Sequence, residues 1–524
     1  MSNLNAATNL LGRNLHPGRA ERPYLVTEQR TWSYDEVAAA ADAAGAGLLD
    51  LGARPGDRVL LALRDRPEFV FTFWGAMKAG LVPVPVAQGL SSSDVHFLLG
   101  DSEARVVVCD ASSAAAVGSA AHHTPTDVLT VGDPAGRPRP DRRSGGRPRP
   151  DRSSGGREAM RSWEDVCGRP AALDPAPTRP DDIALWLYTS GTTGLPKAVM
   201  HRHRTLSAAP SGLFSQVLGA GPDDVVLSVS KMHFAYGLGN SVYLPAAAGA
   251  AVVVDPGPAV PARILDLVRA RRPSVLFGVP SFFNGFERLA DASLPASVRA
   301  VVSAGEALGA DLFDRFRARF DRTLLDGLGA TEALHHITSN RPDSAVAGCA
   351  GAPLEGYEVQ VRDRDGTPVE EGTSGELWVK GPTTLAGYWK RPELTARVLV
   401  DSWFRTGDQV RMVDGQVWHE GRLDDLIKLG GVWVAPGEIE EVLRGHALVA
   451  DAAVVSVDSG TGVPQLKAFV LTESTDPKLP RELVGLCRER LSRFKVPQSF
   501  EIVTELPRTP TGKLKRYVLR GLQP

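Results

Sequence analysis

Stretches typical of buried β-strands alternate with helical stretches along the amino-terminal part of this chain. The strand-like stretches are apolar and lie at Arg58–Leu63, Ala104–Cys109, Ile183–Thr189, Ala251–Val254, Ser274–Gly278 and Ala300–Ser303. The helical stretches between them include Ser33–Asp50, Pro67–Ala79 and Pro261–Arg271. This alternation predicts parallel sheets covered by helices. With 43% hydrophobic and 23% charged residues, the 524-residue chain has a globular composition, which excludes wholesale disorder.

After Ala350 the pattern changes to shorter strands joined by turns. Strands are expected at Glu358–Arg362, Gly375–Val379, Gln409–Val413 and Gln416–His419, with hairpin turns at Asp365-Gly366 and Asp414-Gly415. The C-terminal part reads as a compact α+β unit. It contains a helix from Pro436, strands at Ala452–Val457 and Lys467–Leu471, and a helix over Arg481–Leu491.

A tandem ten-residue repeat stands apart from both patterns, with GRPRPDRRSG at Gly136–Gly145 and GRPRPDRSSG at Gly146–Gly155. It has almost no apolar side chains, so residues 132–157 are expected to form a disordered surface loop. Eight arginines and two aspartates give residues 136–157 a charge of +6, and the chain's total of −2 therefore hides an acidic remainder of −8. A near-neutral total gives no field that attracts nucleic acid over the whole surface. An anionic partner or a membrane surface for this loop is the alternative left open.

The cysteines argue against both a disulfide scaffold and a zinc knuckle. Cys109, Cys167, Cys349 and Cys487 lie tens of residues or more apart, without CxxC or Cys/His spacing, so buried free thiols are expected. Met1–Leu11 lacks the features of a signal peptide. The longest small-apolar run, Ala246–Val254, is well short of the roughly 18 residues that cross a bilayer. We therefore expect a cytoplasmic protein without a membrane partner.

The sharpest chemical feature is Thr189–Lys197, which reads TSGTTGLPK and follows a predicted strand directly. Two glycines, Gly191 and Gly194, let the backbone turn closely around an anion. Donors to phosphate oxygens are supplied by Thr189, Ser190, Thr192, Thr193 and Lys197. Pro196 before the lysine and Ala198 after it depart from the Walker A pattern, which argues against a P-loop kinase or GTPase.

Five motifs in one order make the chain resemble the adenylate-forming superfamily of acyl-CoA synthetases, adenylation domains and luciferases over nearly its whole length. They are Thr189–Lys197, Leu328–Glu332, Arg405–Asp408, Gly421–Lys428 and Pro510–Lys513. The resemblance implies an α/β fold whose large N-terminal domain, residues 1–423, has helix-covered, largely parallel sheets and a small β-barrel-like subdomain. Residues 424–524 would form a small, mobile α+β C-terminal domain.

A carboxylate that attacks the α-phosphorus of ATP brings two anions together, so cations must gather at the site. By resemblance, Lys513 reaches the α-phosphate and the substrate carboxylate. Glu332, after Thr331, would hold Mg²⁺, which prefers few protein carboxylates plus phosphate oxygens. Asp408 would accept both ribose hydroxyls and Arg422 would add its planar fork. A structural salt bridge is the alternative for this last pair.

Two turns resemble the adenine side of the nucleotide site. The first is Ser303–Glu306, in which small residues would admit a flat base, and a plain strand-to-helix turn is its alternative. Its cofactor-binding members would be Ala304, Gly305 and Glu306. The second turn comprises Gly327, Leu328, Gly329 and Ala330. Leu328 stands where many relatives have an aromatic residue that stacks on adenine.

The segments 231–240 and 325–336 closely resemble those of benzoate–coenzyme A ligases. By that resemblance, a flat aryl slot would be lined by Phe234, Ala235, Tyr236, Gly237, Gly327, Gly329 and His335. Small residues facing an aromatic make a narrow cleft that suits a ring better than a flexible chain. Core packing is the alternative for Phe234 and Tyr236. Four histidines stay open between the site and a structural role: His201, His203, His335 and His336.

The second half-reaction needs a thiol at the adenylate carbonyl. Gly430 and Gly431 would let a thin pantetheine arm pass close to the backbone, and Trp433 could pack on that arm or be structural. In the family the C-terminal domain rotates about a hinge residue, here Asp424, and this rotation exchanges Lys513 for the glycine strand. A permanently docked C-terminal domain is the alternative.

Together these features predict ATP- and Mg²⁺-dependent activation of an aryl carboxylic acid and its transfer to coenzyme A. The nearest alternative keeps the adenylate and uses a carrier-protein phosphopantetheine or another small nucleophile as acceptor. Rivals from other classes are a catalytically silent binding protein and a nucleic-acid binder that rests on the repeat, although no nucleic-acid partner is expected. A homodimer is left open.

Overall fold

The computed structural model describes residues 3–122, 124–132, 160–189, 196–425, 427–429, 432–458, 464–508 and 514–521. The predicted disordered loop therefore lies almost wholly outside the described residues. The chain divides into two compact units. The first comprises Met1–Tyr188, Met200–Ser207 and Val254–Pro256, and the second comprises Thr189–Val199, Ala208–Val253 and Gly257–Pro524. The domain boundary predicted at Asp424 lies within the second unit.

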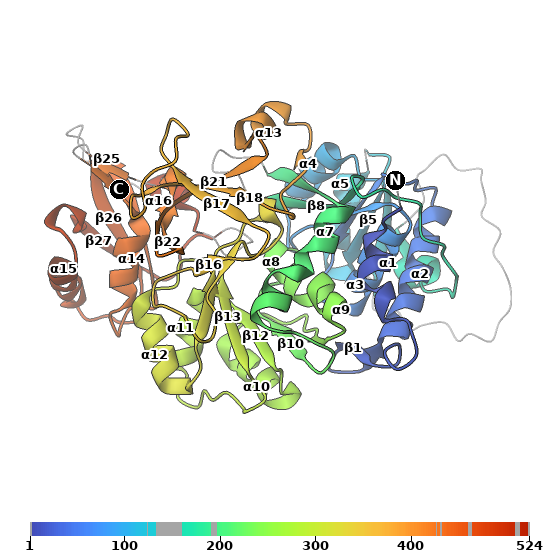
Figure 1. Ribbon diagram of the computed structural model, residues 1–524, viewed down its shortest axis with the longest axis horizontal. Helices are drawn as coiled ribbons and strands as arrows, with labels where there is room; N and C mark the ends of the chain where they lie inside the picture. The colour runs from blue at the N-terminus through green and yellow to red at the C-terminus, as the bar shows by residue number, and fades with distance from the viewer. Residues whose placement is uncertain are drawn as a thin grey trace. The chain divides into compact units, whose positions relative to one another are not determined.

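The first unit contains a parallel sheet, as the strand–helix alternation predicts (Figure 1). Its order is β4 (Val82–Pro85), β3 (Arg58–Ala62), β5 (Val106–Asp110), β6 (Asp127–Val131) and β7 (Arg161–Ser162), and each pairing is parallel. Helices α2 (Tyr34–Asp50) and α3 (Pro67–Lys78) pack against each other. Ser33, expected as the first residue of α2, instead caps it in a capping box with Glu36.

The second unit contains its own run of parallel strands. Their order is β14 (Leu324–Gly327), β13 (Ala300–Ala304), β12 (Val275–Gly278), β10 (Val225–Ser228) and β11 (Ala251–Val253). The helices between these strands include α10 (Pro261–Arg271), α11 (Pro280–Arg288) and α12 (Ala310–Phe320). Phe283 of α11 and Phe316 of α12 are fully buried in the core that these helices share with the strands.

An antiparallel sheet of the second unit stands where the small β-barrel-like subdomain is expected. Its order is β17 (Glu358–Arg362), β18 (Gly375–Lys380), β21 (Trp403–Val413) and β20 (Leu399–Val400), with β22 (Gln416–Arg422) paired to β21. Strand β21 begins at Trp403 rather than at the predicted Gln409, so the motif Arg405–Asp408 lies inside a strand. Asp414 and Gly415 have φ values of 51° and 70°, which fit the tight hairpin turn predicted there.

The C-terminal residues form the expected α+β arrangement. Its elements are α14 (Pro436–Arg444), β25 (Asp451–Asp458), β26 (Pro464–Leu471), α15 (Leu479–Arg490) and β27 (Ser499–Val503). Strand β26 pairs antiparallel with β25 and parallel with β27. Ile439, Leu443 and Leu483 are fully buried in the core between the helices and this sheet. Within the described ranges, no helix combines the length and the hydropathy needed to cross a membrane.

Candidate active site

The carboxyl ends of β13 and β14 bring two of the predicted turns together. In the parallel pairing, Ala304 lies opposite Gly327 and Ser303 lies opposite Asp326. Gly305 follows with a φ of +90°, a left-handed value that favours glycine. Ligands of open parallel sheets bind outside the carboxyl ends of the strands. The two adenine-side turns therefore lie where sheet geometry expects a ligand.

Asp326, at the end of β14, carries a buried carboxyl at this edge of the sheet. Burial raises the pKa of its carboxyl well above the ordinary range, and hydrogen bonds with backbone groups of Gly327 and Leu308 only partly offset that rise. Its Oδ1 is buried and has no hydrogen-bond partner among the described residues. A buried polar atom without a partner is costly, and a nucleobase with donors and acceptors at its edge could supply one. Adenine at this edge stays a prediction.

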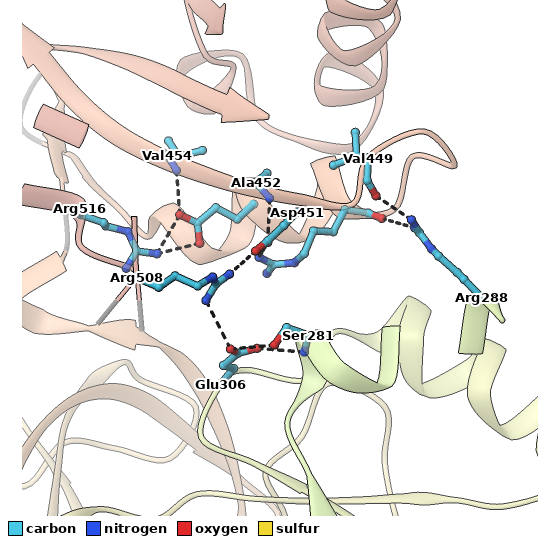
Figure 2. Close-up of polar contacts among 11 residues, drawn as sticks. Ser281, Arg288, Glu306, Val449, Asp451, Ala452, Val454, Arg508 and Arg516 are labelled. Atoms are coloured by element: carbon cyan, nitrogen blue, oxygen red, sulfur yellow. Dashed lines mark hydrogen bonds and ion pairs between the residues drawn. The ribbon is translucent and has the colours of Figure 1, made fainter. Parts of the chain in front are cut away.

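The carboxylate of Glu306 is held by protein groups (Figure 2). Its Oε2 accepts the Ser281 backbone N–H at 3.0 Å and its Oε1 accepts the Ser281 hydroxyl at 3.1 Å. Nη1 of Arg508 lies 3.9 Å from Oε1, and the same guanidinium contacts Asp451. Glu306 thus connects the adenine-side turn to α11 and to C-terminal residues. Its contact with a nucleotide stays a prediction.

Lys197, Glu332 and Tyr388 form a compact cluster. Lys197 Nζ lies 3.8 Å from Glu332 Oε1 and 3.2 Å from the Tyr388 hydroxyl, which itself donates to Glu332 Oε1 at 2.6 Å. Burial and the Glu332 charge raise the pKa of Tyr388, so the phenol stays a donor. Burial lowers the pKa of Lys197, and the Glu332 charge opposes that shift. A single carboxylate suits Mg²⁺, which takes most of its remaining ligands from phosphate and water.

Sequence reasoning missed Tyr388. It lies in β19 (Gly387–Tyr388), 56 residues from Glu332 and 191 residues from Lys197. No spacing along the chain signals a contact over such separations. An isolated tyrosine also carries no chemical signature of its own.

Asp408 and Arg422 lie opposite each other where β21 pairs with β22. Arg422 Nη1 donates to Asp408 Oδ1 at 3.0 Å and to the Thr406 carbonyl at 2.9 Å. His419 Nε2, which the sequence did not single out, lies 3.3 Å from the same Oδ1. Burial alone would raise the pKa of Asp408, but Arg422 and His419 outweigh it and hold that pKa well below its usual range. The site therefore presents a fixed, ionised carboxylate that can accept two ribose hydroxyls.

Tyr236 and His335 of the predicted aryl slot lie together, with ring centroids 5.5 Å apart. Two glycines predicted to line the slot, Gly237 and Gly329, are also required by the packing of the backbone. A Cβ at Gly237 would collide with the Lys231 carbonyl, and a Cβ at Gly329 would lie 2.5 Å from the His335 carbonyl. Close backbone packing therefore accounts for both glycines.

The remaining predicted residues take varied places. Ala235 begins α8 (Ala235–Leu238), and Phe234 is the N-cap of that helix. Thr189 ends β8 (Ile183–Thr189), Thr331 begins η6 (Thr331–Ala333), and Asp424 lies in η7 (Leu423–Asp425). Leu328 and Ala330 are partly buried. Outside the described residues lie Ser190, Gly191, Thr192, Thr193, Gly194, Gly430, Gly431 and Lys513. Trp433 lies in β24 (Val432–Val434). Among the open histidines, His203 accepts the Ala6 N–H at 3.1 Å, which favours a structural role.

Comparison with known proteins gives matches along the whole chain. The family model described as AMP-binding enzyme matches residues 16–389, and that of the AMP-binding enzyme C-terminal domain matches residues 438–513. The benzoate–CoA ligase of Thauera aromatica is 35% identical over 528 residues, which cover 99% of this chain and 96% of that protein. The 4-hydroxybenzoate–CoA/benzoate–CoA ligase of Rhodopseudomonas palustris is also 35% identical, with coverages of 99% and 94%.

A solved structure agrees with the sequence matches. The crystal structure of the anthranilate CoA ligase AuaEII in complex with anthranoyl-AMP has a TM-score of 0.90 and 31% identity to this chain. The superposition covers 99% of this chain and 97% of that one. Fold and sequence therefore point to the same group of proteins.

Proposed function

The chain belongs to the AMP-binding enzyme family, and from this premise we propose that it activates an aryl carboxylic acid with ATP and transfers the acyl group to coenzyme A. The similar proteins named above are ligases of benzoate, hydroxybenzoate and anthranilate with CoA. One observation carries the proposal. Asp408 chiefly raises the pKa of Arg422, and the Glu332 and Asp424 carboxylates add smaller contributions, so the charge of the Lys197–Glu332–Tyr388 cluster acts on the Asp408–Arg422 pair.

In the first half-reaction, an oxygen of the aryl carboxylate bonds to the α-phosphorus of ATP and the bond to pyrophosphate breaks. Lys197 and Lys513 would offset the negative charge that two anions bring together. Glu332 would hold Mg²⁺, which neutralises phosphate oxygens when bound. Tyr388 fixes the Glu332 carboxylate through its hydrogen bond. Asp408 would hold the ribose.

In the second half-reaction, the CoA sulfur bonds to the acyl carbon, the bond to AMP breaks, and the thiol proton leaves to solvent. We assign residues 1–423 to an adenylation domain and residues 424–524 to a lid that turns about Asp424. The turn would remove Lys513 and bring Gly430 and Gly431 alongside the pantetheine arm, so that one cleft serves both reactions.

This division of labour predicts that Lys513→Ala abolishes adenylation but largely spares thioester formation from supplied acyl-adenylate. The physical reason is that the lysine stabilises charge at phosphorus, whose bonds do not change in the second step, where the bond between the acyl carbon and the AMP oxygen breaks. Pre-steady-state measurement of each half-reaction checks it. Equal losses of rate in both half-reactions would contradict the proposed replacement of Lys513 by Gly430 and Gly431.

The proposed function is tested by ATP–pyrophosphate exchange over a panel of aryl acids, followed by AMP release with and without CoA. We expect exchange with aryl acids, CoA-dependent AMP release and an aryl-CoA product of the correct mass. Exchange with no acid would overturn the function. If AMP release needs a phosphopantetheinylated carrier protein rather than CoA, the acyl acceptor is the carrier protein. Light scattering on the purified chain decides whether it forms a homodimer.

A further inference from the structure

Two adjacent histidines are buried beside the predicted aryl slot. His335 is 7% exposed and His336 is 3% exposed. The ring centroid of Tyr236 lies 5.5 Å from each of theirs. Burial lowers the pKa of His336 to about 3 and that of His335 well below its ordinary value. Both rings are therefore neutral at physiological pH, with one donor nitrogen and one acceptor nitrogen each.

Hydrogen bonds fix which nitrogen carries the proton in each ring. Asn240 Nδ2 donates to Ser228 Oγ at 3.4 Å, so its Oδ1 faces His335 Nε2, 3.0 Å away. His335 Nε2 must therefore be the donor, which leaves Nδ1 of that ring as an acceptor. The two Nδ1 atoms lie 3.0 Å apart, so His336 Nδ1 donates to His335 Nδ1.

This chain of hydrogen bonds ends on an acceptor. With its proton on Nδ1, His336 has a bare lone pair on Nε2. That nitrogen is buried and has no hydrogen-bond partner among the described residues. A buried acceptor without a hydrogen bond is unfavourable. In native structures a ligand, an ion or a water usually supplies the missing partner.

The position of His336 Nε2 connects it to the ligand edge of the sheet. An ideal Cβ built on Gly327 would lie 2.7 Å from Nε2, so the nitrogen faces the last residue of β14. This is the carboxyl end of a parallel strand, where open sheets bind ligands. A side chain at residue 327 would collide with the His336 ring and with the Thr338 carbonyl, so glycine lets the ring lie directly against this end of the strand.

We propose that His336 Nε2 accepts a hydrogen bond from a hydroxyl or amino group on the ring of the aryl acid, so that the enzyme prefers a hydroxy- or aminobenzoate to benzoate. The inference rests on the proposed function and names its substrate class. A site built to bond a polar substituent discriminates strongly against the analogue that lacks it, because its own polar atom is then left unpaired.

The experiment measures kcat/KM of ATP–pyrophosphate exchange for benzoate and for the three hydroxy and three amino isomers. We expect at least one substituted acid to exceed benzoate by about tenfold or more. In His336→Leu, which keeps the bulk and removes the acceptor, the ratio of that acid to benzoate should fall by about tenfold. His336→Gln, whose amide oxygen can accept, should restore part of the ratio. His446→Leu, a histidine of the C-terminal α+β part, should leave the ratio unchanged.

Other outcomes separate the two proposals. Exchange with benzoate that equals exchange with all six substituted acids would overturn this inference and leave the proposed function intact. Equal losses for every acid in His336→Leu would show that a buried water or a structural role occupies Nε2, and would also overturn it. Exchange with none of the seven acids would overturn the proposed function and this inference together.

Discussion

Asp408 is a buried carboxylate that stays ionised because two neighbours on the paired strand compensate its charge. Arg422 and His419 both reach its Oδ1 from β22. Gly407 makes room for this arrangement, since a Cβ there would lie 3.0 Å from Arg422 Nη2. Its φ of +73° is also a left-handed value that glycine adopts easily. The Asp408–Arg422 pair thus depends both on compensation of the Asp408 charge and on the absence of a side chain at Gly407.

We expect Asp408→Asn to raise the KM for ATP by tenfold or more, because the neutral amide is a weaker acceptor of ribose hydroxyls. It should also reduce the free energy of unfolding by about 1–3 kcal/mol. This is below the 3–5 kcal/mol typical of a broken buried pair, because the Arg422 side chain is 42% exposed. Steady-state kinetics and denaturant unfolding check both effects. An unchanged KM would leave Asp408 with a structural role only.

The same pair predicts a pH dependence of stability. The folded-state pKa of Asp408 is depressed, so its contribution is present above the unfolded value, about 3.9, and is lost as the pH falls through the folded-state pKa. The difference in unfolding free energy between wild type and Asp408→Asn should therefore be constant near neutral pH and shrink below about pH 4. Denaturant unfolding across pH 2.5–7 measures it. A difference that grows with acid would contradict the assignment.

Tyr388→Phe removes the hydroxyl that joins Lys197 and Glu332 and keeps the ring. With its hydrogen bond lost, the Glu332 carboxylate would be less well oriented toward a metal–phosphate group. We expect the Mg²⁺ concentration for half-maximal exchange to rise several-fold, with a smaller change in kcat. Tyr357→Phe is the matched control, since its hydroxyl bonds Thr383 at 2.5 Å. Equal effects of both variants would contradict a specific role for Tyr388.

At the scale of elements, helices α2 and α3 approach each other through glycine. A Cβ on Gly45 would lie 2.6 Å from the Gly75 carbonyl, and a Cβ on Gly75 would collide with the Ala41 carbonyl. Backbone atoms cannot move aside as a flexible side chain can. The close packing of the two helices therefore depends on the absence of these side chains.

Gly75→Ala should reduce stability by roughly 1–3 kcal/mol, despite the better helix propensity of alanine, because the methyl group overpacks the helix contact. Gly100→Ala in α4 (Ser92–Ser102) is the control. Nothing lies within 4 Å of a Cβ there, so alanine should be neutral or stabilising. Thermal unfolding compares the two. If both variants shift Tm alike, propensity rather than packing decides the effect.

At the scale of the whole molecule, several polar contacts join C-terminal residues to α11 and α12. Arg288 donates to the Val449 carbonyl at 2.8 Å and to the Arg444 carbonyl at 3.3 Å (Figure 2). Glu441 Oε1 accepts the Ala310 N–H at 3.1 Å at the start of α12. Polar contacts of this kind exchange readily with water, which is compatible with the proposed turn of the lid.

Arg288→Ala removes both carbonyl contacts at once. We expect thermolysin to cleave the chain near Asp424 several-fold faster, because undocked states of the C-terminal residues become more populated. Arg269→Ala is the control, since that arginine of α10 bonds Asp291 rather than a C-terminal residue. Cleavage near Asp424 at the same rate in both variants would show that the contacts do not limit docking.

The sequence by itself determined the α/β character, the order of the motifs and most element positions, because strand and helix periodicity and turn chemistry are local properties. Predicted ranges such as Pro261–Arg271 and Glu358–Arg362 agree with α10 and β17 residue for residue. Boundaries shifted where a side chain caps rather than continues an element, as Ser33 does. The motifs also indicate Glu332, Asp408 and Arg422 as site residues.

Only the tertiary structure decided which side chains meet. It brought Tyr388 to Glu332 and Lys197, added His419 to Asp408, and engaged Glu306 with Ser281 and Arg508. Among the residues that the structure describes, it left His336 Nε2 without a hydrogen-bond partner. It also showed that close backbone packing requires glycine at positions 237 and 329. These facts depend on distances between residues far apart in the chain. No local pattern encodes such distances, because they follow from the packing of whole elements.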